Sequence, residues 1–297
     1  MNSGFAAKIA ARRFVVTGEL TPPKGTDLSK LYATAERLRD TVDAINITES
    51  PRARMSMDGR AVAKLLLDRG IETIVQVTGR DRNRIAVQSE LLGAAALGLG
   101  NFVFMGGDSP AGGDHPQAKA VFDLPASGLI AAAEALRHGR DLAGNPLAGT
   151  PQLFIGATAN PGADNFAGEV ENTRRKIDAG AKFLQTQAVY HGDILERFID
   201  AVKPDGVAVL AGIIPLKSEK TGPWLVANLP GVHVPADMLQ AMDDAARAGV
   251  VRERGTELAA RVIAELRPLC QGVHLMAIGW EAEIPGILAA AGLGGAR

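Results

Sequence analysis

Short runs of apolar and β-branched residues alternate with longer amphipathic segments along the whole chain. The runs are apolar at nearly every position, which is typical of strands buried on both faces of a parallel sheet. Each run is followed by a segment with helical periodicity. We therefore predict eight strand–helix units, with strands at residues 13–20, 44–50, 72–79, 101–107, 152–160, 182–190, 206–215 and 272–279.

Eight such units in 297 residues predict an α/β fold, a (β/α)8 TIM barrel that forms a single domain over residues 1–297. A doubly wound open sheet is the alternative. Two segments interrupt the regular alternation. One is a loop rich in glycine and proline at 108–121, and the other adds two helical stretches at about 234–266, before the last strand.

Several residues mark where the predicted helices begin and end. Gly70, Gly98 and Gly180 each follow a helical run, where a residue with a left-handed backbone is favoured. Asp58 and Asp193 precede helical runs and are predicted to be N-caps.

Composition and charge narrow the functional classes. The 32 basic and 33 acidic residues are balanced, whereas nucleic-acid-binding proteins usually have a basic excess. Cys270 is the single cysteine, which excludes a disulfide within the chain and suits a reducing cytoplasm. No apolar stretch reaches the roughly 18 residues of a membrane span, and the N-terminus does not resemble a signal peptide. We expect a cytoplasmic protein that binds neither nucleic acid nor membrane.

Polar residues at the ends of the predicted strands are the candidates for function, because reacting groups of such barrels lie at the carboxyl ends of the strands. The first strand ends in Glu19, followed by Pro22 and Pro23, which restrict the backbone beyond it. The fourth ends in Gly107 and Asp108. Other strand ends supply Thr48, Gln76, Asn160 and Gln187.

The five histidines show no metal-ligand spacing, and no motif for nucleophilic catalysis is present. We therefore predict no metal site. Carboxylates and amides suit a site that binds a hydrogen-bonding heterocycle together with a cofactor that performs the difficult chemistry.

Each candidate also has an ordinary structural interpretation. Glu19 could cap a neighbouring loop or pair with Arg12. Asp108 could be a turn residue, and Gln187 could fill the barrel interior. The segment ENTRRKIDAG (171–180) could be a solvated helix. The residue types alone leave these interpretations open.

Five segments together resemble the methylenetetrahydrofolate reductase family. They are GELTPP (18–23), NIT (46–48), MGGDSP (105–110), NTRRKIDAGAKFLQTQ (172–187) and AGIIPL (211–216). The resemblance runs from about residue 13 to residue 293. It implies a flavin-bearing barrel that reduces 5,10-methylenetetrahydrofolate to 5-methyltetrahydrofolate by hydride transfer from reduced FAD. The segment at 78–98 is similar to compact bacterial members that consist of the catalytic domain alone.

The resemblance implies that Glu19 is the general acid that protonates the leaving folate nitrogen as the methylene bridge opens. Apolar neighbours would help such a carboxyl group to hold its proton. Asp108 is the second implied catalytic residue and hydrogen-bonds the pterin near the flavin. Gln187 and Thr48 are implied substrate contacts. The implied FAD-binding residues are Thr48, Gln76, Gly107, Asp108, Val121, Phe122, Glu169, Asn172, Arg175 and Lys176.

Three positions depart from the family pattern. Gln76 stands where a histidine is common, and Gly106 stands where an arginine is frequent, so both bear on whether FAD is retained. Trp280 stands where an arginine often serves the nicotinamide nucleotide. The electron donor is therefore left open between NADH, NADPH and an electron-donating partner protein.

Two other functions are compatible with the same residues. One is a pterin-dependent methyltransferase that acts on methyltetrahydrofolate and a corrinoid protein. The other is a non-catalytic barrel subunit of a redox complex. In the reductase interpretation, the partners are the folate substrate and a second copy of the chain, since we expect a homo-oligomer.

Overall fold

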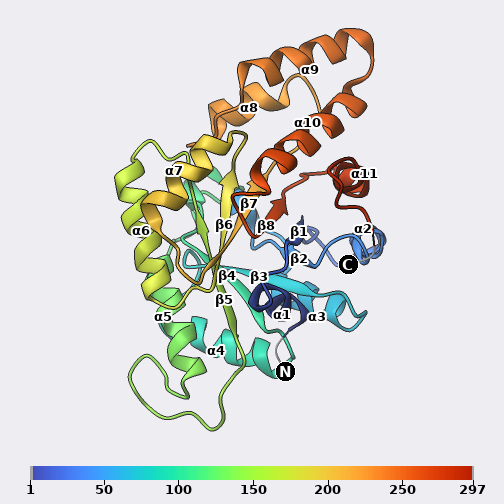
Figure 1. The fold of residues 1–297 in the computed structure, drawn as a ribbon. Coiled ribbons are helices and arrows are strands. Elements are labelled where there is room, and N and C mark those ends of the chain that lie inside the picture. The colour runs from blue at the N-terminus through green and yellow to red at the C-terminus, as the bar shows by residue number, and fades with distance from the viewer. Residues whose placement is uncertain (1–2, 296–297) are drawn as a thin grey trace.

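Eight parallel strands close into a barrel in the computed structural model, which describes residues 3–295 (Figure 1). Each strand pairs with its neighbours in sequence, and β8 pairs with β1. The predicted (β/α)8 barrel is confirmed. The strands are β1 Val15–Leu20, β2 Ala44–Ile47, β3 Thr73–Thr78, β4 Asn101–Met105, β5 Phe154–Ala159, β6 Phe183–Ala188, β7 Ala208–Ile213 and β8 Gly272–Leu275.

Helices surround the barrel and, among the described residues, follow every strand (Figure 1). The two helical stretches predicted before the last strand are present as α9 and α10. None of the helices in residues 3–295 combines the length and apolar character needed to cross a membrane. The helices are α1 Gly4–Ala10, α2 Ser29–Leu38, α3 Gly59–Leu67, α4 Arg84–Ala96, α5 Ala126–Arg137, α6 Phe166–Asp178, α7 Gly192–Val202, α8 Thr221–Asn228, α9 Ala236–Ala248, α10 Val251–Leu266 and α11 Ile284–Ala290.

Helix ends follow the sequence signals with one exception. Gly70, Gly98 and Gly180 all have positive φ, as predicted. Asp58 caps α3 by accepting a hydrogen bond from a backbone N–H of that helix.

The prediction that Asp193 is an N-cap is wrong, because His191 holds that position and Asp193 already lies in the first turn of α7. The N–H of Gly192 binds the carboxylate of Glu265 on α10. A residue distant in sequence therefore satisfies a group that a local cap would otherwise bind.

The amino-terminal half of the barrel interior is apolar. Side chains from α1 close it from below, and the ring of Phe5 packs edge-on against the ring of Phe183 with centroids 5.3 Å apart. Phe183 also stacks on Phe154. The cluster contains Phe5, Ile9, Val15, Ala44, Ile74, Val103, Phe183, Ala208 and Leu210.

The carboxyl-terminal half of the interior is polar. Side chains two residues apart in a strand share a face, so Val15 in the apolar cluster places Thr17 and Glu19 inside the barrel as well. The same period leads from Ala44 to Asn46 and from Ile74 to Gln76. The barrel therefore changes from apolar to polar along its axis, and the polar end lies where the active sites of such barrels form.

We expect Gly156→Ala to destabilise the protein by about 1–3 kcal/mol, the usual cost of overpacking a core. Gly156 pairs with Phe183 in the sheet, and a Cβ at this position would lie 2.3 Å from the Phe183 ring. Urea unfolding measures the change. The control is Gly93→Ala on α4, where a Cβ meets nothing within 4 Å and alanine favours the helix. Equal unfolding midpoints for both variants would contradict the prediction.

Candidate active site

The side chain of Glu19 faces the interior of the barrel. The Nε2 of Gln76 donates a 2.8 Å hydrogen bond to Glu19 Oε2, and His274 Nε2 lies 3.4 Å from the same oxygen. Gln76 is on β3, which does not neighbour β1, so the two side chains meet only through the barrel interior. The Glu19 side chain keeps 19% of its surface exposed and reaches the open end of the barrel.

The immediate neighbours of the Glu19 carboxyl differ from the prediction. The prediction that apolar side chains surround this carboxyl group is wrong, because the amide of Gln76 and the imidazole of His274 flank it. The alternative pairing with Arg12 is also not what holds Glu19. His274 was not predicted to be a functional residue, because its sequence position shows no metal-ligand spacing. Its place as the penultimate residue of an otherwise apolar strand was the available signal.

The ends of β3 and β4 lie beside the segment that contains Val121 and Phe122. The N–H of Val121 binds the carbonyl of Arg80, and the N–H of Phe122 binds the carbonyl of Gly79. Val121 and Phe122 expose 45% and 44% of their surface, so two apolar side chains face solvent at the rim. The backbone of Gly107 packs closely against the side chain of Thr78. A Cβ at position 107 would lie only 2.9 Å from Thr78.

Asp108 holds the loop that follows β2. Its Oδ2 accepts a 2.8 Å hydrogen bond from the backbone N–H of Arg52, whose guanidinium lies 5.3 Å from the ring centroid of Trp224 on α8. Loops from two distant strands therefore meet at the rim. A turn residue usually binds the backbone of its own turn, whereas Asp108 binds the loop that follows β2. The interpretation of Asp108 as a turn residue is therefore incomplete.

Thr48 and Gln187 make local contacts. The hydroxyl of Thr48 donates to the Thr21 hydroxyl over 3.1 Å. The side-chain oxygen of Gln187 accepts from the N–H of Ala188, beside an irregularity in the pairing of β6 with β7. These contacts place both residues at the carboxyl ends of their strands, and their substrate roles stay predictions.

Helix α6 carries the predicted phosphate-binding residues in two different environments. Lys176 is buried, and its Nζ donates a 2.7 Å hydrogen bond to the carbonyl of Thr158. Burial lowers the pKa of Lys176, while the nearby Glu169 carboxylate opposes that shift. Arg175 is exposed and lies 3.6 Å from Glu171. The solvated-helix interpretation therefore fits Arg175 and is wrong for Lys176.

Glu169 and Asn172 join Lys176 in this cluster. Glu169 Oε1 accepts from the backbone N–H of Asn160 at 2.9 Å, and Glu169 Oε2 accepts from the Asn172 amide at 3.2 Å. The cluster ties the end of β5 to α6. Four of the predicted cofactor-binding residues therefore lie together on one helix, with Arg175 facing outward.

Three buried polar atoms within residues 3–295 have no hydrogen-bond partner: Asn46 Oδ1, Thr78 Oγ1 and Asn160 Oδ1. Thr78 lies against Gly107, and Asn160 lies beside Glu169. Buried polar atoms are normally paired, so unpaired ones at two strand ends are suited to accept or donate hydrogen bonds to a bound ligand.

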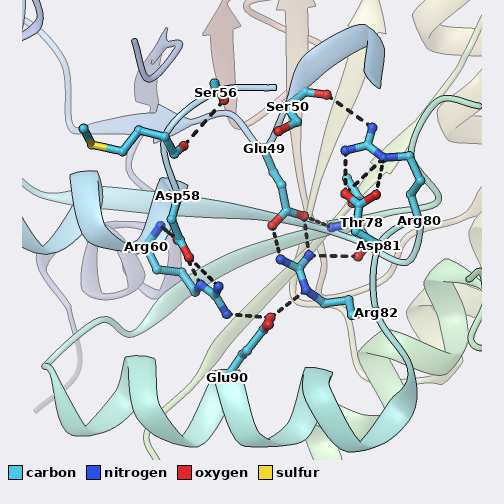
Figure 2. A network of polar contacts seen from close by, with 11 residues as sticks. Glu49, Ser50, Ser56, Asp58, Arg60, Thr78, Arg80, Asp81, Arg82 and Glu90 are labelled. Atoms are coloured by element: carbon cyan, nitrogen blue, oxygen red, sulfur yellow. Dashed lines mark hydrogen bonds and ion pairs between the residues drawn. The ribbon is translucent and has the colours of Figure 1, made fainter. Parts of the chain in front are cut away.

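A network of alternating charges, absent from the predictions, fixes the loops after β2 and β3 (Figure 2). The Glu49 carboxylate binds the N–H of Thr78 at 2.5 Å and the guanidinium of Arg82 at 2.6 Å. Arg82 and Arg60 both bind Glu90 on α4, and burial raises the pKa of the Glu90 carboxyl. The network fixes the end of β3 that carries Gln76.

A cavity of about 950 Å³ lies at the opposite end of the barrel, among Glu72, Asn101, Gln152 and Lys182. These residues lie at or before the amino ends of the strands, where barrel residues serve stability more often than chemistry. Among the described residues, no group of three or more potential ligands could hold a metal ion. The candidate active site is therefore the polar carboxyl-terminal rim around Glu19.

A closed parallel barrel with a carboxyl group, amides and an imidazole inside its carboxyl-terminal end belongs to the class of α/β barrels that bind ligands at this rim. The chain is a member of the methylenetetrahydrofolate reductase family, since the model of that family, described as "Methylenetetrahydrofolate reductase", matches residues 5–292.

Curated relatives match with low identity. A probable methylenetetrahydrofolate reductase (NADH) of Oryza sativa subsp. japonica is 24% identical over 238 residues, which cover 75% of this chain and 38% of the relative. A probable methylenetetrahydrofolate reductase (NADPH) of Caenorhabditis elegans is 24% identical over 242 residues, or 78% of this chain and 34% of the relative. The chain therefore spans little more than a third of the length of these relatives.

Solved structures show the same fold. An uncharacterized protein from Clostridium thermocellum that binds two copies of 5-methyl-5,6,7,8-tetrahydrofolic acid has a TM-score of 0.65 at 17% identity and covers 97% of this chain and 98% of that one. A 2,3-dimethylmalate lyase has a TM-score of 0.55 at 12% identity, covering 97% and 85%. At sequence identities this low, the structural similarity shows a shared barrel fold.

We expect Arg82→Met to cost about 3–5 kcal/mol of stability, because it leaves the carboxylate of Glu49 without its bound cation in a mostly buried site. The side chains of Arg82 and Glu49 are only 11% and 14% exposed. Arg247→Met is the control, since its side chain is 70% exposed and such pairs contribute about 0–1 kcal/mol. Chemical denaturation compares the two, and a loss for Arg82→Met no larger than that of the control would contradict the prediction.

Proposed function

We propose that this protein reduces 5,10-methylenetetrahydrofolate to 5-methyltetrahydrofolate, with Glu19 as the general acid. The observation that carries the proposal is the Glu19 carboxyl group, which faces the barrel interior at the carboxyl-terminal rim and is held there by Gln76. Family membership and the names of the curated relatives support the reaction. The Clostridium thermocellum barrel supports a folate as the ligand.

The substrate carries a one-carbon bridge between folate nitrogens N5 and N10. When the bond from the bridge carbon to N10 breaks, its electron pair stays on N10, and the proton of Glu19 passes to that nitrogen. The bridge carbon is left as an iminium with N5 and accepts a hydride to become a methyl group. Glu19 is suited to the proton transfer because β1 and the Gln76 contact fix its position.

FAD is the proposed cofactor, and when bound it supplies the hydride. The exposed apolar side chains of Val121 and Phe122, with Gly107 beside them, would hold its ring. The cations Arg175 and Lys176 on α6 would hold its phosphates. The unpaired buried oxygen of Thr78 supports a ligand at this place. The residues present therefore fit the cofactor.

The remaining predicted contacts have defined roles in the proposal. Asp108, Gln187 and Thr48 would bind the pterin or flavin with the polar atoms not used in their present contacts. Asn172 and Glu169 would position Lys176. Gln76 binds Glu19 in this structure, so its proposed role is at the acid as well as at the flavin. The donor is NADH, NADPH or a partner protein.

We expect Glu19→Gln to lower turnover by about 10²–10⁴-fold, the range for loss of a general acid, while folate affinity changes little. Anaerobic reduction of the enzyme followed by reoxidation with methylenetetrahydrofolate isolates the step. Glu257→Gln is the control, because that side chain is exposed on α10. A Glu19→Gln enzyme that reoxidises at the wild-type rate would overturn the assignment of the acid.

Lys176→Met is expected to weaken FAD binding by about 10–100-fold, because a hydrogen bond to a charged group contributes roughly 1.5–3 kcal/mol. Titration of the flavin-free protein with FAD, followed by flavin absorbance, measures the affinity. Lys30→Met on α2 changes an exposed lysine and serves as the control. No flavin binding by the wild-type protein would instead favour the pterin-dependent methyltransferase.

A further inference from the structure

His274 is the buried titratable side chain closest to the proposed acid. It is only 3% exposed and lies on β8, which pairs with β1. Its Nε2 lies 3.4 Å from Glu19 Oε2. Its Nδ1 lies 2.9 Å from the Thr17 hydroxyl and 3.3 Å from the Asn46 amide nitrogen. Both nitrogens of the ring therefore have polar neighbours.

The neighbours of Nδ1 fix the tautomer of the ring. The amide nitrogen of Asn46 lies 3.5 Å from the carbonyl oxygen of Gly18, which can only accept a hydrogen bond. This contact orients the amide so that its nitrogen, a donor, also faces His274 Nδ1. Nδ1 is then an acceptor, and a neutral imidazole carries its proton on Nε2, which faces Glu19.

Thr17 is also placed to donate a hydrogen bond to His274 Nδ1. The amide nitrogen of Gln185 donates to the Thr17 hydroxyl oxygen over 3.3 Å. The hydroxyl proton of Thr17 is then available for His274 Nδ1. Hydrogen bonds therefore run in one direction from Gln185 through Thr17 to His274, whose other ring nitrogen lies 3.4 Å from Glu19.

We propose that His274 is a positioning residue that determines which oxygen of Glu19 delivers the proton. Gln76 donates a hydrogen bond to Glu19 Oε2, and His274 Nε2 brings a second donor to within 3.4 Å of the same oxygen. An oxygen that accepts a hydrogen bond from Gln76 and has a second N–H close by is the less favourable place for the acidic proton. Oε1 is therefore the oxygen that carries the proton. This inference rests on the proposed function of Glu19.

One other arrangement fits the same heavy atoms. Glu19 could carry its proton on Oε2 and donate it to Nε2, with the ring protonated on Nδ1. That tautomer would place an N–H of the ring against the N–H groups of Asn46, 3.3 Å away. The two arrangements differ in an observable property, the tautomer of a single histidine.

Long-range proton–nitrogen NMR spectra of protein labelled with ¹⁵N-histidine test the tautomer without any assay of activity. The chain has five histidines, and the resonances lost in His274→Gln identify His274. We expect the pattern of the Nε2–H tautomer in the neutral ring. The pattern of the Nδ1–H tautomer would overturn the inference whether or not the protein is a reductase.

Kinetics test the consequence. His274→Leu is expected to lower kcat by about 10–100-fold, as when a group that orients a functional residue is lost, with KM nearly unchanged. His274→Gln keeps a donor and should recover most of the rate. In a Glu19→Gln background, His274→Leu should have no further effect, because both changes remove the same function.

Asn101→Leu is the matched control, since it removes a buried polar side chain at the opposite end of the barrel. It should lower stability without lowering the kcat of the folded enzyme. A wild-type kcat in the His274→Leu variant would overturn the inference about His274 and leave the proposed function intact. A wild-type enzyme without reductase activity under any electron donor would instead overturn the proposed function, while the NMR pattern would still decide the tautomer.

Discussion

The structure depends on one constraint, which is that polar side chains inside a closed barrel can bind only one another or a bound ligand. Backbone groups of the strands are already paired, and apolar side chains from α1 and the strands close the barrel from below. Buried side chains therefore bind groups on other strands, either on the paired strand, as His274 and Thr17 do, or across the interior, as Glu19 and Gln76 do. Those partners come from strands that are distant in sequence, so closure of the barrel itself orients the candidate acid.

At the carboxyl-terminal rim, side chains from other segments also stabilise an unfavourable backbone conformation. Ser50, Arg52 and Ala53, which follow β2, all have positive φ, a conformation that costs non-glycine residues about 1 kcal/mol or more each. Asp108 binds the N–H of Arg52, and Arg80 binds the carbonyl of Ser50. The strained loop is thus held by side chains from the segments that follow β3 and β4.

The fold was predictable because its signals are local. Apolar runs bounded by turns give the strands, and Gly70 or Asp58 marks a helix end whatever the rest of the chain does. The position of Glu19 near the end of its strand was predictable for the same reason, since a strand end followed by two prolines is visible in the sequence. The position of Asp193 was not, because Glu265 from α10 replaces the local cap of α7.

The partners of Glu19 could not be predicted, because they depend on which residues of distant strands reach the same level of the barrel. The two-residue period does identify Thr17, Asn46, Gln76 and His274 as inward-facing, but it gives no distances. On α6 the helical period was informative: Val170, Thr173 and Lys176 recur every three residues on the buried face, which separates Lys176 from Arg175.

Two departures from the family pattern, Gln76 and Gly106, change which groups lie beside Glu19 and Asp108. Gln76, where a histidine is common, places an amide donor on Glu19 Oε2, and the amide cannot change its charge. Gly106, where an arginine is frequent, adds no side chain beside Asp108, whose Oδ2 binds the backbone N–H of Arg52. Gln76 therefore contributes a neutral donor where a histidine could be charged, and Gly106 contributes no side-chain charge where an arginine would.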